Sequence, residues 1–152
     1  MTRHSASLIH RRLVDSLYTE AMLLADEARG YFDLVGRGER QELEALNRVA
    51  FSCESLKVTT RLMHIIAWLL TQRAVEAGEI TQRDALSPSR RLGEAPDSDP
   101  DTLSVMPAQA AAIIRTSVTL YGRVARLDQS LEERPAVVSP ARTMIQRLAA
   151  SF

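Results

Sequence analysis

The sequence predicts an all-α fold, an antiparallel three-helix bundle, and three observations favour it. Apolar residues recur at helical spacing over three long segments of the 152-residue chain. Only 5% of the residues are aromatic, and six Gly with six Pro provide too few turns for a β-sandwich or barrel. With 45% hydrophobic and 25% charged residues, the composition is that of one ordinary globular domain.

The first helix is expected from about Ser7 to Leu34. Its apolar residues lie three or four positions apart and form one stripe, which is typical of a helix that packs on a core. The stripe consists of Ile9, Leu13, Leu17, Ala21, Leu24, Ala28, Tyr31 and Leu34. Gly36 and Gly38 follow directly, and we expect them to end the helix and permit a tight reversal.

The second helix is the longest, from about Glu39 to Ala77, and Gly78 is its expected C′ residue. We assign its core-facing stripe to Leu43, Leu46, Ala50, Cys53, Leu56, Thr60, Met63, Ala67, Leu70 and Ala74. A short helical turn should follow, because Thr81 with Asp84 three positions later resembles a capping pair.

The segment from Ser87 to Leu103 interrupts the periodic pattern. It holds three Pro, one Gly and four acidic residues against two Arg, which predicts a solvated, flexible linker. The third helix should run from Met106 or Pro107 to Glu133, because proline suits a first helical turn. Its expected stripe is Ala110, Ile113, Ser117, Leu120, Val124, Leu127 and Leu131.

The C-terminal tail begins after Pro135 stops the third helix. Ser139–Pro140 is a suitable N-cap and N1 pair, so a short helix over Ala141–Ala150 is plausible. We therefore divide the chain into a bundle domain, residues 1–134, and a flexible tail, residues 135–152.

Two segments are apolar around more of their circumference than one core stripe requires. They are Leu62–Gln72 in the second helix and Ala110–Ile114 in the third. Leu62–Gln72 carries no charge, and adjacent residues on a helix diverge by about 100°. Exposed apolar surface of this size usually marks an interface, and a symmetric dimer is the commonest closed arrangement. We therefore predict a homodimer that buries this second face; its interface residues would be Ile65, Ile66, Trp68, Leu69 and Ile114. The alternative is that the linker and tail fold back over the same face.

Charge and hydropathy indicate a cytoplasmic protein. The 19 basic and 19 acidic residues balance, which argues against a general nucleic-acid coat or a membrane-surface protein. The N-terminus shows no signal-peptide pattern. Leu62–Gln72, the longest nearly uncharged apolar run, has 11 residues, whereas roughly 20 are needed to span a bilayer.

No metal, cofactor or catalytic site is expected. None of His4, His10 and His64 has a Cys, His or carboxylate one turn later to complete a ligand pair. Cys53 lies on the assigned core stripe, where a thiol would be buried and little ionised. The phosphate-binding and nucleophile-elbow motifs are also absent.

Three features allow two interpretations each. Val58-Thr59-Thr60 in mid-helix indicates either tight helix packing, with hydroxyls bonded to the preceding turn, or a polar groove at a partner site. Trp68 is either a core residue or an interface anchor. We favour a core or interface histidine at His64 over a metal ligand.

Several short elements within Glu54–Ile80 form a distinctive combination. They are Glu54-Ser55-Leu56-Lys57, Thr59-Thr60-Arg61-Leu62-Met63, Trp68-Leu69-Leu70, Gln72-Arg73-Ala74-Val75 and Gly78-Glu79. This stretch resembles the family of the regulator of CtrA degradation (RcdA), which is found in alphaproteobacteria. Outside it the likeness is one of architecture, and the linker and tail differ from the family pattern.

The resemblance implies a dimeric three-helix bundle that acts as an adaptor, not an enzyme, for the cytoplasmic ClpXP protease. It implies a response-regulator receiver protein as the partner that primes ClpX, cargo that includes cell-cycle transcription regulators, and recruitment to a cell pole. The cargo can differ from that of the best-known family member if the individual linker and tail contact it.

We expect the tail to form an adhesive helix for cargo or partner; its contact residues would be Arg142, Met144, Ile145, Arg147 and Leu148. The alternative is that this helix docks on its own bundle. Two other function classes stay open. One is a helical module that binds DNA or a transcription regulator through the terminal Arg clusters. The other is a small-ligand enzyme or sensor with a pocket near His64 and Thr59–Thr60.

Overall fold

The computed structural model describes residues 2–133 and 140–151 of the chain. Side chains are described from residue 7 to residue 133 and, in the tail, at residues 144, 145 and 147–151. The expected boundary between bundle and tail at residues 134 and 135, and the side chain of Arg142, lie outside these described residues.

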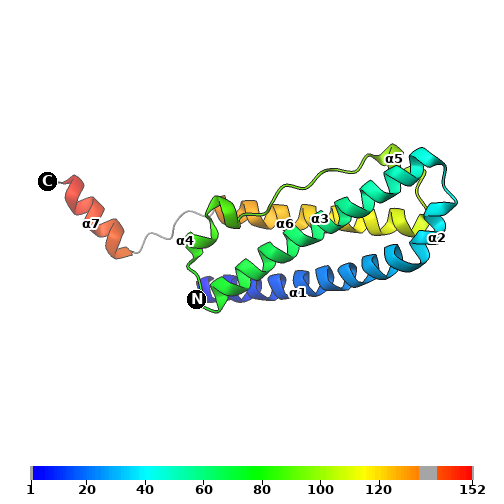
Figure 1. The fold of residues 1–152 in the computed structure, drawn as a ribbon. Helices are drawn as coiled ribbons and strands as arrows, with labels where there is room; N and C mark the ends of the chain where they lie inside the picture. Colours follow the sequence, from blue (N-terminus) through cyan, green and yellow to red (C-terminus); the bar gives the residue numbers. More distant parts are fainter. Residues whose placement is uncertain (1, 134–139, 152) are drawn as a thin grey trace.

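Three long helices, α1, α3 and α6, form the bundle (Figure 1). In chain order the elements are α1 (Thr2–Gly30), the π-helix η1 (Tyr31–Val35), α2 (Gly36–Gln41), α3 (Ala45–Glu76), α4 (Gln82–Ala85), the 3-10 helix η2 (Pro88–Arg90), α5 (Pro100–Ser104), α6 (Ala108–Glu133) and α7 (Pro140–Ala150). The regular structure of the described residues is all helical, which confirms the predicted fold class. No helix in these residues combines the length and apolarity that a membrane span needs.

Helix α1 runs opposite to both α3 and α6, whereas α3 and α6 run parallel (Figure 1). Contacts between the latter two advance in the same direction, because Arg61 donates to Ser117 at 3.3 Å and Trp68 donates to Asp128 at 2.9 Å. The antiparallel order expected from the sequence thus holds for α1 but not for the α3–α6 pair. The reason is the long connection between them, which crosses the length of the bundle before α6 begins.

The first helical hairpin turns later than the sequence predicts. The chain stays helical through η1 and α2, and Gly36 itself is helical (φ −61°, ψ −28°). A Cβ at Gly36 would lie 2.9 Å from the backbone oxygen of Tyr31, so this glycine permits a close approach at the π-helix. The prediction that Gly36 and Gly38 end the helix is therefore wrong. The turn lies just before α3, where Glu44 is extended (φ −63°, ψ 156°).

The end of α3 confirms the predicted stop signal. Gly78 has a φ of 74°, and its N–H donates to the carbonyl of Val75 at 3.0 Å. The N–H of Glu79 donates to the carbonyl of Ala74 at 2.9 Å, so the last turn is closed by a Schellman motif. The capping box between Thr81 and Asp84 is also present and starts α4, as expected.

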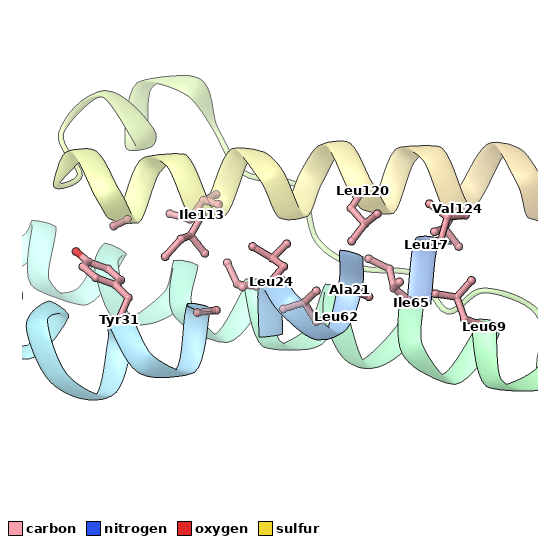
Figure 2. Packing of buried hydrophobic residues seen from close by; sticks show 14 of the residues in the cluster. Leu17, Ala21, Leu24, Tyr31, Leu62, Ile65, Leu69, Ile113, Leu120 and Val124 are labelled. Carbon is pink, nitrogen blue, oxygen red and sulfur yellow. The ribbon is translucent and has the colours of Figure 1, made fainter. Parts of the chain in front are cut away.

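The core lies between the three long helices, where apolar side chains of each meet (Figure 2). Its labelled members are Leu17, Ala21, Leu24 and Tyr31, then Leu62, Ile65 and Leu69 of α3, and Ile113, Leu120 and Val124 of α6. Full burial of one large apolar side chain contributes about 1.5–3 kcal/mol, so this cluster supplies the main stabilisation of the bundle. The predicted stripes of α1 and α6 contribute most of their members to it.

Candidate interaction surface

The segment expected to be a flexible linker packs along the bundle instead. We call residues 91–99 the strap; it runs beside α3 and α6 (Figure 1). Side chains of these two helices donate to three of its backbone carbonyls, which fixes its path. The bonds are Tyr121 to Gly93 (2.6 Å), Arg61 to Pro96 (2.8 Å) and Lys57 to Asp97 (3.0 Å).

Two charged side chains lie on the buried face of α3. Glu54 and Arg61 are each 2% exposed. Arg61 donates to the hydroxyls of Ser98 (2.6 Å) and Ser117 (3.3 Å), and Ser98 in turn donates to Glu54. Lys57 pairs with Glu54 at 3.0 Å. Burial lowers the pKa of Arg61, and the nearby carboxylate of Glu54 opposes that shift.

A second polar cluster anchors the start of the strap. Asp128 of α6 accepts hydrogen bonds from the indole N–H of Trp68 at 2.9 Å and from Arg91 at 2.8 and 3.1 Å. Arg91 also donates to Glu132 at 3.0 Å. The hydrogen bonds to Asp128 and then to Glu132 raise the pKa of the Arg91 guanidinium. Neither cluster could be predicted from sequence patterns, because the members of each come from segments far apart along the chain.

The residues predicted as the dimer interface lie mostly inside the subunit. Ile65, Leu69 and Ile114 are 0% exposed and Trp68 is 2% exposed, while Ile66 is partly buried against the core. These five side chains therefore form no exposed patch. Because Trp68 also donates to a buried carboxylate, the structure supports its interpretation as a core residue. The connection before α6 covers part of this face, as the alternative interpretation expected of the linker, whereas the tail helix α7 lies apart from it (Figure 1).

Most of the stripe assigned to the core of α3 lies instead on the exposed face. Leu46, Leu56 and Met63 are 85%, 68% and 66% exposed. The assignment was wrong because both faces of the helix carry apolar residues. The bundle buries the face on which Arg61 and Lys57 donate hydrogen bonds to the strap. We call the following residues the α3 stripe: Leu46, Val49, Cys53, Leu56, Thr60, Met63, Ala67, Leu70 and Ala74.

The α3 stripe carries no charged residue of its own, and the charges beside it are engaged elsewhere. Between Arg48 and Arg73, within a helix that is fully described, the charged residues are Glu54, Lys57 and Arg61. Two of them are buried, and Lys57 is bonded to Glu54 and to the strap. A partner could therefore cover this face without stripping water from an unpaired charge.

The threonine hydroxyls of α3 are satisfied within the helix. Each donates to the carbonyl one turn earlier, in the pairs Thr59 to Ser55 (3.2 Å), Thr60 to Leu56 (3.0 Å) and Thr71 to Ala67 (3.0 Å). The back-bonding expected for Thr59 and Thr60 is thus confirmed. It leaves the α3 stripe effectively apolar even where a threonine belongs to it.

An apolar groove of about 500 Å³ lies beside the α3 stripe, between α1 and α3. It is lined by Ala25, Ala28 and Arg29 of α1, by Phe32 and Asp33 of η1, and by Ser55, Val58, Thr59, Leu62, Met63, Ile66 and Ala67 of α3. Met63 and Ala67 belong to both the groove and the stripe, so the two features form one continuous surface.

Within the described residues, no group of three or more His, Cys, Asp or Glu side chains is placed to hold a metal ion. Cys53, which we expected to be buried, is exposed on the α3 stripe because this face points outward. His64 packs against the strap so closely that a Cβ at Gly93 would lie 2.3 Å from its Nδ1.

Helix α7 lies apart from the three long helices in Figure 1. Three of the predicted tail contacts are exposed apolar side chains, Met144, Ile145 and Leu148, and Arg147 is exposed beside them. This placement brings four of the five predicted tail residues together on one short helix. Their role in binding stays a prediction.

Comparison with known proteins places the chain among two sets of relatives. Residues 5–152 match a family model described as a protein of unknown function (DUF1465). Among solved structures, the chain is similar to the crystal structure of RcdA from Caulobacter crescentus CB15, with a TM-score of 0.65 and 31% sequence identity. That similarity covers 78% of this chain and 90% of the other. No curated protein sequence matches the chain.

Proposed function

Because the chain belongs to the DUF1465 family and is RcdA-like, we propose that it is a non-enzymatic adaptor that tethers cell-cycle regulatory cargo to a receiver-primed ClpXP protease. The observation that carries this proposal is the match to RcdA, a regulator of CtrA degradation by name, at 31% identity over 78% of the chain. Its partners are ClpX, a response-regulator receiver protein and cargo transcription regulators, and its place is the cytoplasm with recruitment to a cell pole.

The architecture supports a tethering role. The α3 stripe with its adjoining groove and the apolar residues of α7 provide two separate adhesive surfaces on one small chain. An adaptor that holds cargo and protease together raises their effective concentration and can add orders of magnitude in avidity without new chemistry. Such a role needs surfaces and no catalytic residue.

Helix α7 is the proposed contact for cargo or partner. Leu148 lies four positions after Met144 and three after Ile145, which are the spacings with which an amphipathic helix enters an apolar groove. Arg142 and Arg147 add positive charge, which favours a partner surface with acidic residues at its rim. We also propose that the working form is a homodimer, which doubles the number of such helices in one assembly.

The test is degradation of candidate cargo in a reconstituted reaction with ClpXP and a receiver protein, with and without the purified chain. We expect the chain to shorten the half-life of at least one cell-cycle regulator, and only when the receiver protein is present. Unchanged half-lives across all candidate regulators would reject the proposal.

The contribution of α7 is tested in the same reaction with paired substitutions. Ile145→Ser with Leu148→Ser should slow delivery of cargo by about 10-fold or more, because each removes an apolar contact from a coupled helix. Ala149→Ser on the same helix is the matched control and should leave the rate within about 2-fold of the wild type. Equal effects of both changes would assign α7 no adhesive role.

A further inference from the structure

We propose that the tail helix α7 folds back into the α1–α3 groove of its own subunit and covers it until a partner takes its place. The groove is apolar and exposed, and α7 carries three apolar side chains that no other described part of the chain covers. We call the docked arrangement the latch. Its effect on the delivery of cargo rests on the proposed function, whereas the contact between α7 and the groove does not.

The connection to α7 is long enough to reach the groove. Helix α6 ends at the same end of the bundle at which α1 begins and α3 ends (Figure 1). The groove residue of α3 nearest that end is Ala67. Because Asp128 lies beside Trp68, Glu133 is only about 9 Å farther along the bundle than Ala67. The seven Cα–Cα steps from Glu133 to the start of α7 span up to about 25 Å, which covers this distance and the width of one helix.

The length of α7 matches that of the groove. A helix that enters from this end runs antiparallel to α3. The 11 residues of α7 are about 16 Å long at 1.5 Å per residue. The α3 side of the groove extends from Ser55 to Ala67, which is about 18 Å. The whole of α7 therefore fits along the groove.

The side chains of the two surfaces are complementary in size. Small residues, such as Ala25 and Ala67, face each other across the groove and leave it hollow. The apolar side chains of α7 are large, and Met144, Ile145 and Leu148 are 65%, 64% and 55% exposed. Docking removes all three from water and places them against small neighbours, as when an amphipathic helix binds in a groove.

The charges of the two helices are of opposite sign. Residues 13–36 carry five acidic residues and one Arg, whereas α7 carries two Arg and no acidic residue. Asp15 of α1 pairs with Arg73 of α3, and this register places Asp26 level with Leu62 at the rim of the groove. Docked α7 therefore brings Arg147 beside Asp26, where the two charges attract.

The groove between α1 and α6 is a poorer site for α7. Four of its nine lining residues are charged, against two of twelve in the α1–α3 groove. The four are Glu20, Glu27, Arg115 and Arg123. An apolar helix that docked there would strip water from these charges without replacing it.

A short tether makes a weak contact sufficient for the latch. Two surfaces on such a tether meet at an effective concentration of the order of 1 mM. A contact with a Kd of about 0.1 mM thus keeps α7 docked about ten times as long as free. A partner that binds either surface more tightly displaces the latch and exposes the other surface as well.

The first test is an intramolecular disulfide in the full chain, with diamide as the oxidant and Cys53→Ala as the background. Met63→Cys with Leu148→Cys should form a disulfide within one chain, which a non-reducing gel separates from dimers. The matched control is Leu23→Cys with Leu148→Cys, because Leu23 is as exposed as Met63 (64% and 66%) but lies beside α6. Its yield should be lower by about 5-fold or more. Equal yields, or a disulfide that forms only between two chains, would overturn the proposal.

The second test measures how far α7 shields the groove when no covalent bond holds it. The thiol of Met63→Cys, again with Cys53→Ala, reacts with DTNB at a concentration where the chain is monomeric. Ile145→Ser with Leu148→Ser should raise the reaction rate by about 10-fold, because the docked form is lost. Ala149→Ser on the same helix should leave the rate within about 2-fold. A rate that the paired substitution leaves unchanged would refute the latch.

A third comparison separates the latch from the proposed function. The chain closed by the disulfide between Met63→Cys and Leu148→Cys is assayed for delivery of cargo before and after reduction with dithiothreitol. Reduction should speed delivery by about 10-fold or more, because it frees both surfaces. Equal delivery by both forms would reject the regulatory effect of the latch. If neither form nor the wild type delivers cargo, the proposed function fails, while the disulfide yields and the DTNB rates still decide whether α7 docks.

Discussion

The buried face of α3 carries Glu54, Arg61 and Gln72, whereas its exposed face carries Leu56, Met63 and Leu70. The usual distribution of polarity on a bundle helix is thus reversed over much of its length. The apolar residues of the buried face, such as Ile65 and Leu69, do fill the core, but charge lies among them.

This difference between the two faces shows that hydrogen-bond donors and acceptors nearby decide which face of α3 is buried. The charges of the inner face find acceptors and donors in the strap and in α6, so their burial is compensated. The outer face needs no such partners, and no other described part of the subunit covers it. A helix with two apolar faces can therefore serve the core with one and an interface with the other.

The largest effect should come from removing a buried charge rather than an exposed apolar side chain. Arg61→Ala removes the donor that binds Pro96, Ser98 and Ser117, and it leaves the buried carboxylate of Glu54 without the neighbouring guanidinium, so it should lower the free energy of unfolding by about 3–5 kcal/mol. Leu56→Ala on the other face should cost under about 0.5 kcal/mol at concentrations where the chain is monomeric. Urea unfolding followed by circular dichroism measures both. A larger loss for Leu56→Ala would mean that the outer face, not the inner one, stabilises the subunit.

The Asp128 cluster should show the next largest effect. Asp128→Ala leaves the indole N–H of Trp68 buried without its acceptor and leaves Arg91 with Glu132 alone, so we expect a loss of about 2–3 kcal/mol. Trp68→Phe removes the donor while Arg91 still holds Asp128, and it should cost about 1–2 kcal/mol. The double variant should cost less than the sum of the two, because they share one hydrogen bond. Strict additivity would show that this bond contributes nothing.

Local signals in the sequence predicted the helices and several of their ends. Gly78 and the Thr81–Asp84 pair specify their turns through their own backbone and side chains, so no distant residue is needed to interpret them. The continuation of the first helix through Gly36 was missed, because it depends on packing of Tyr31 against the following turn. Local chemistry thus determines a cap but does not by itself determine a hairpin.

The choice of face on α3 could not be made from the sequence. Because Glu54 and Arg61 are charged, the sequence alone argues against burial of their face. Their partners, Ser98 and the carbonyl of Pro96, follow more than 30 positions later in the chain. The spacing of the α3 stripe was visible, but the same spacing suits a core and an interface. The decisive information was the path of the strap.

The closeness of the strap to α3 predicts a moderate effect at a glycine. Gly93→Ala would bring a Cβ within 2.3 Å of the His64 ring, so the strap or the ring must move, and we expect a loss of about 1–3 kcal/mol. Gly122→Ala in α6 is the control, because a Cβ there meets only the end of Arg126 at 4.0 Å, and it should stabilise by about 0.5–1 kcal/mol. Thermal melts compare the two. Adding His64→Ala to Gly93→Ala should recover part of the loss, and no recovery would place the strain elsewhere.

The smallest effect should be the pH dependence of the capping box that starts α4. Hydrogen bonds from Thr81 lower the pKa of Asp84 below its ordinary 3.8. Because the folded-state pKa is the lower one, the stabilisation is present above 3.8 and is lost as the pH falls through the folded value. The difference in unfolding free energy between wild type and Asp84→Ala should thus be larger at about pH 7 than at about pH 2. A difference that is the same at both pH values would show that the charge of Asp84 adds nothing to the cap, and that α4 owes its position to its contacts with α3.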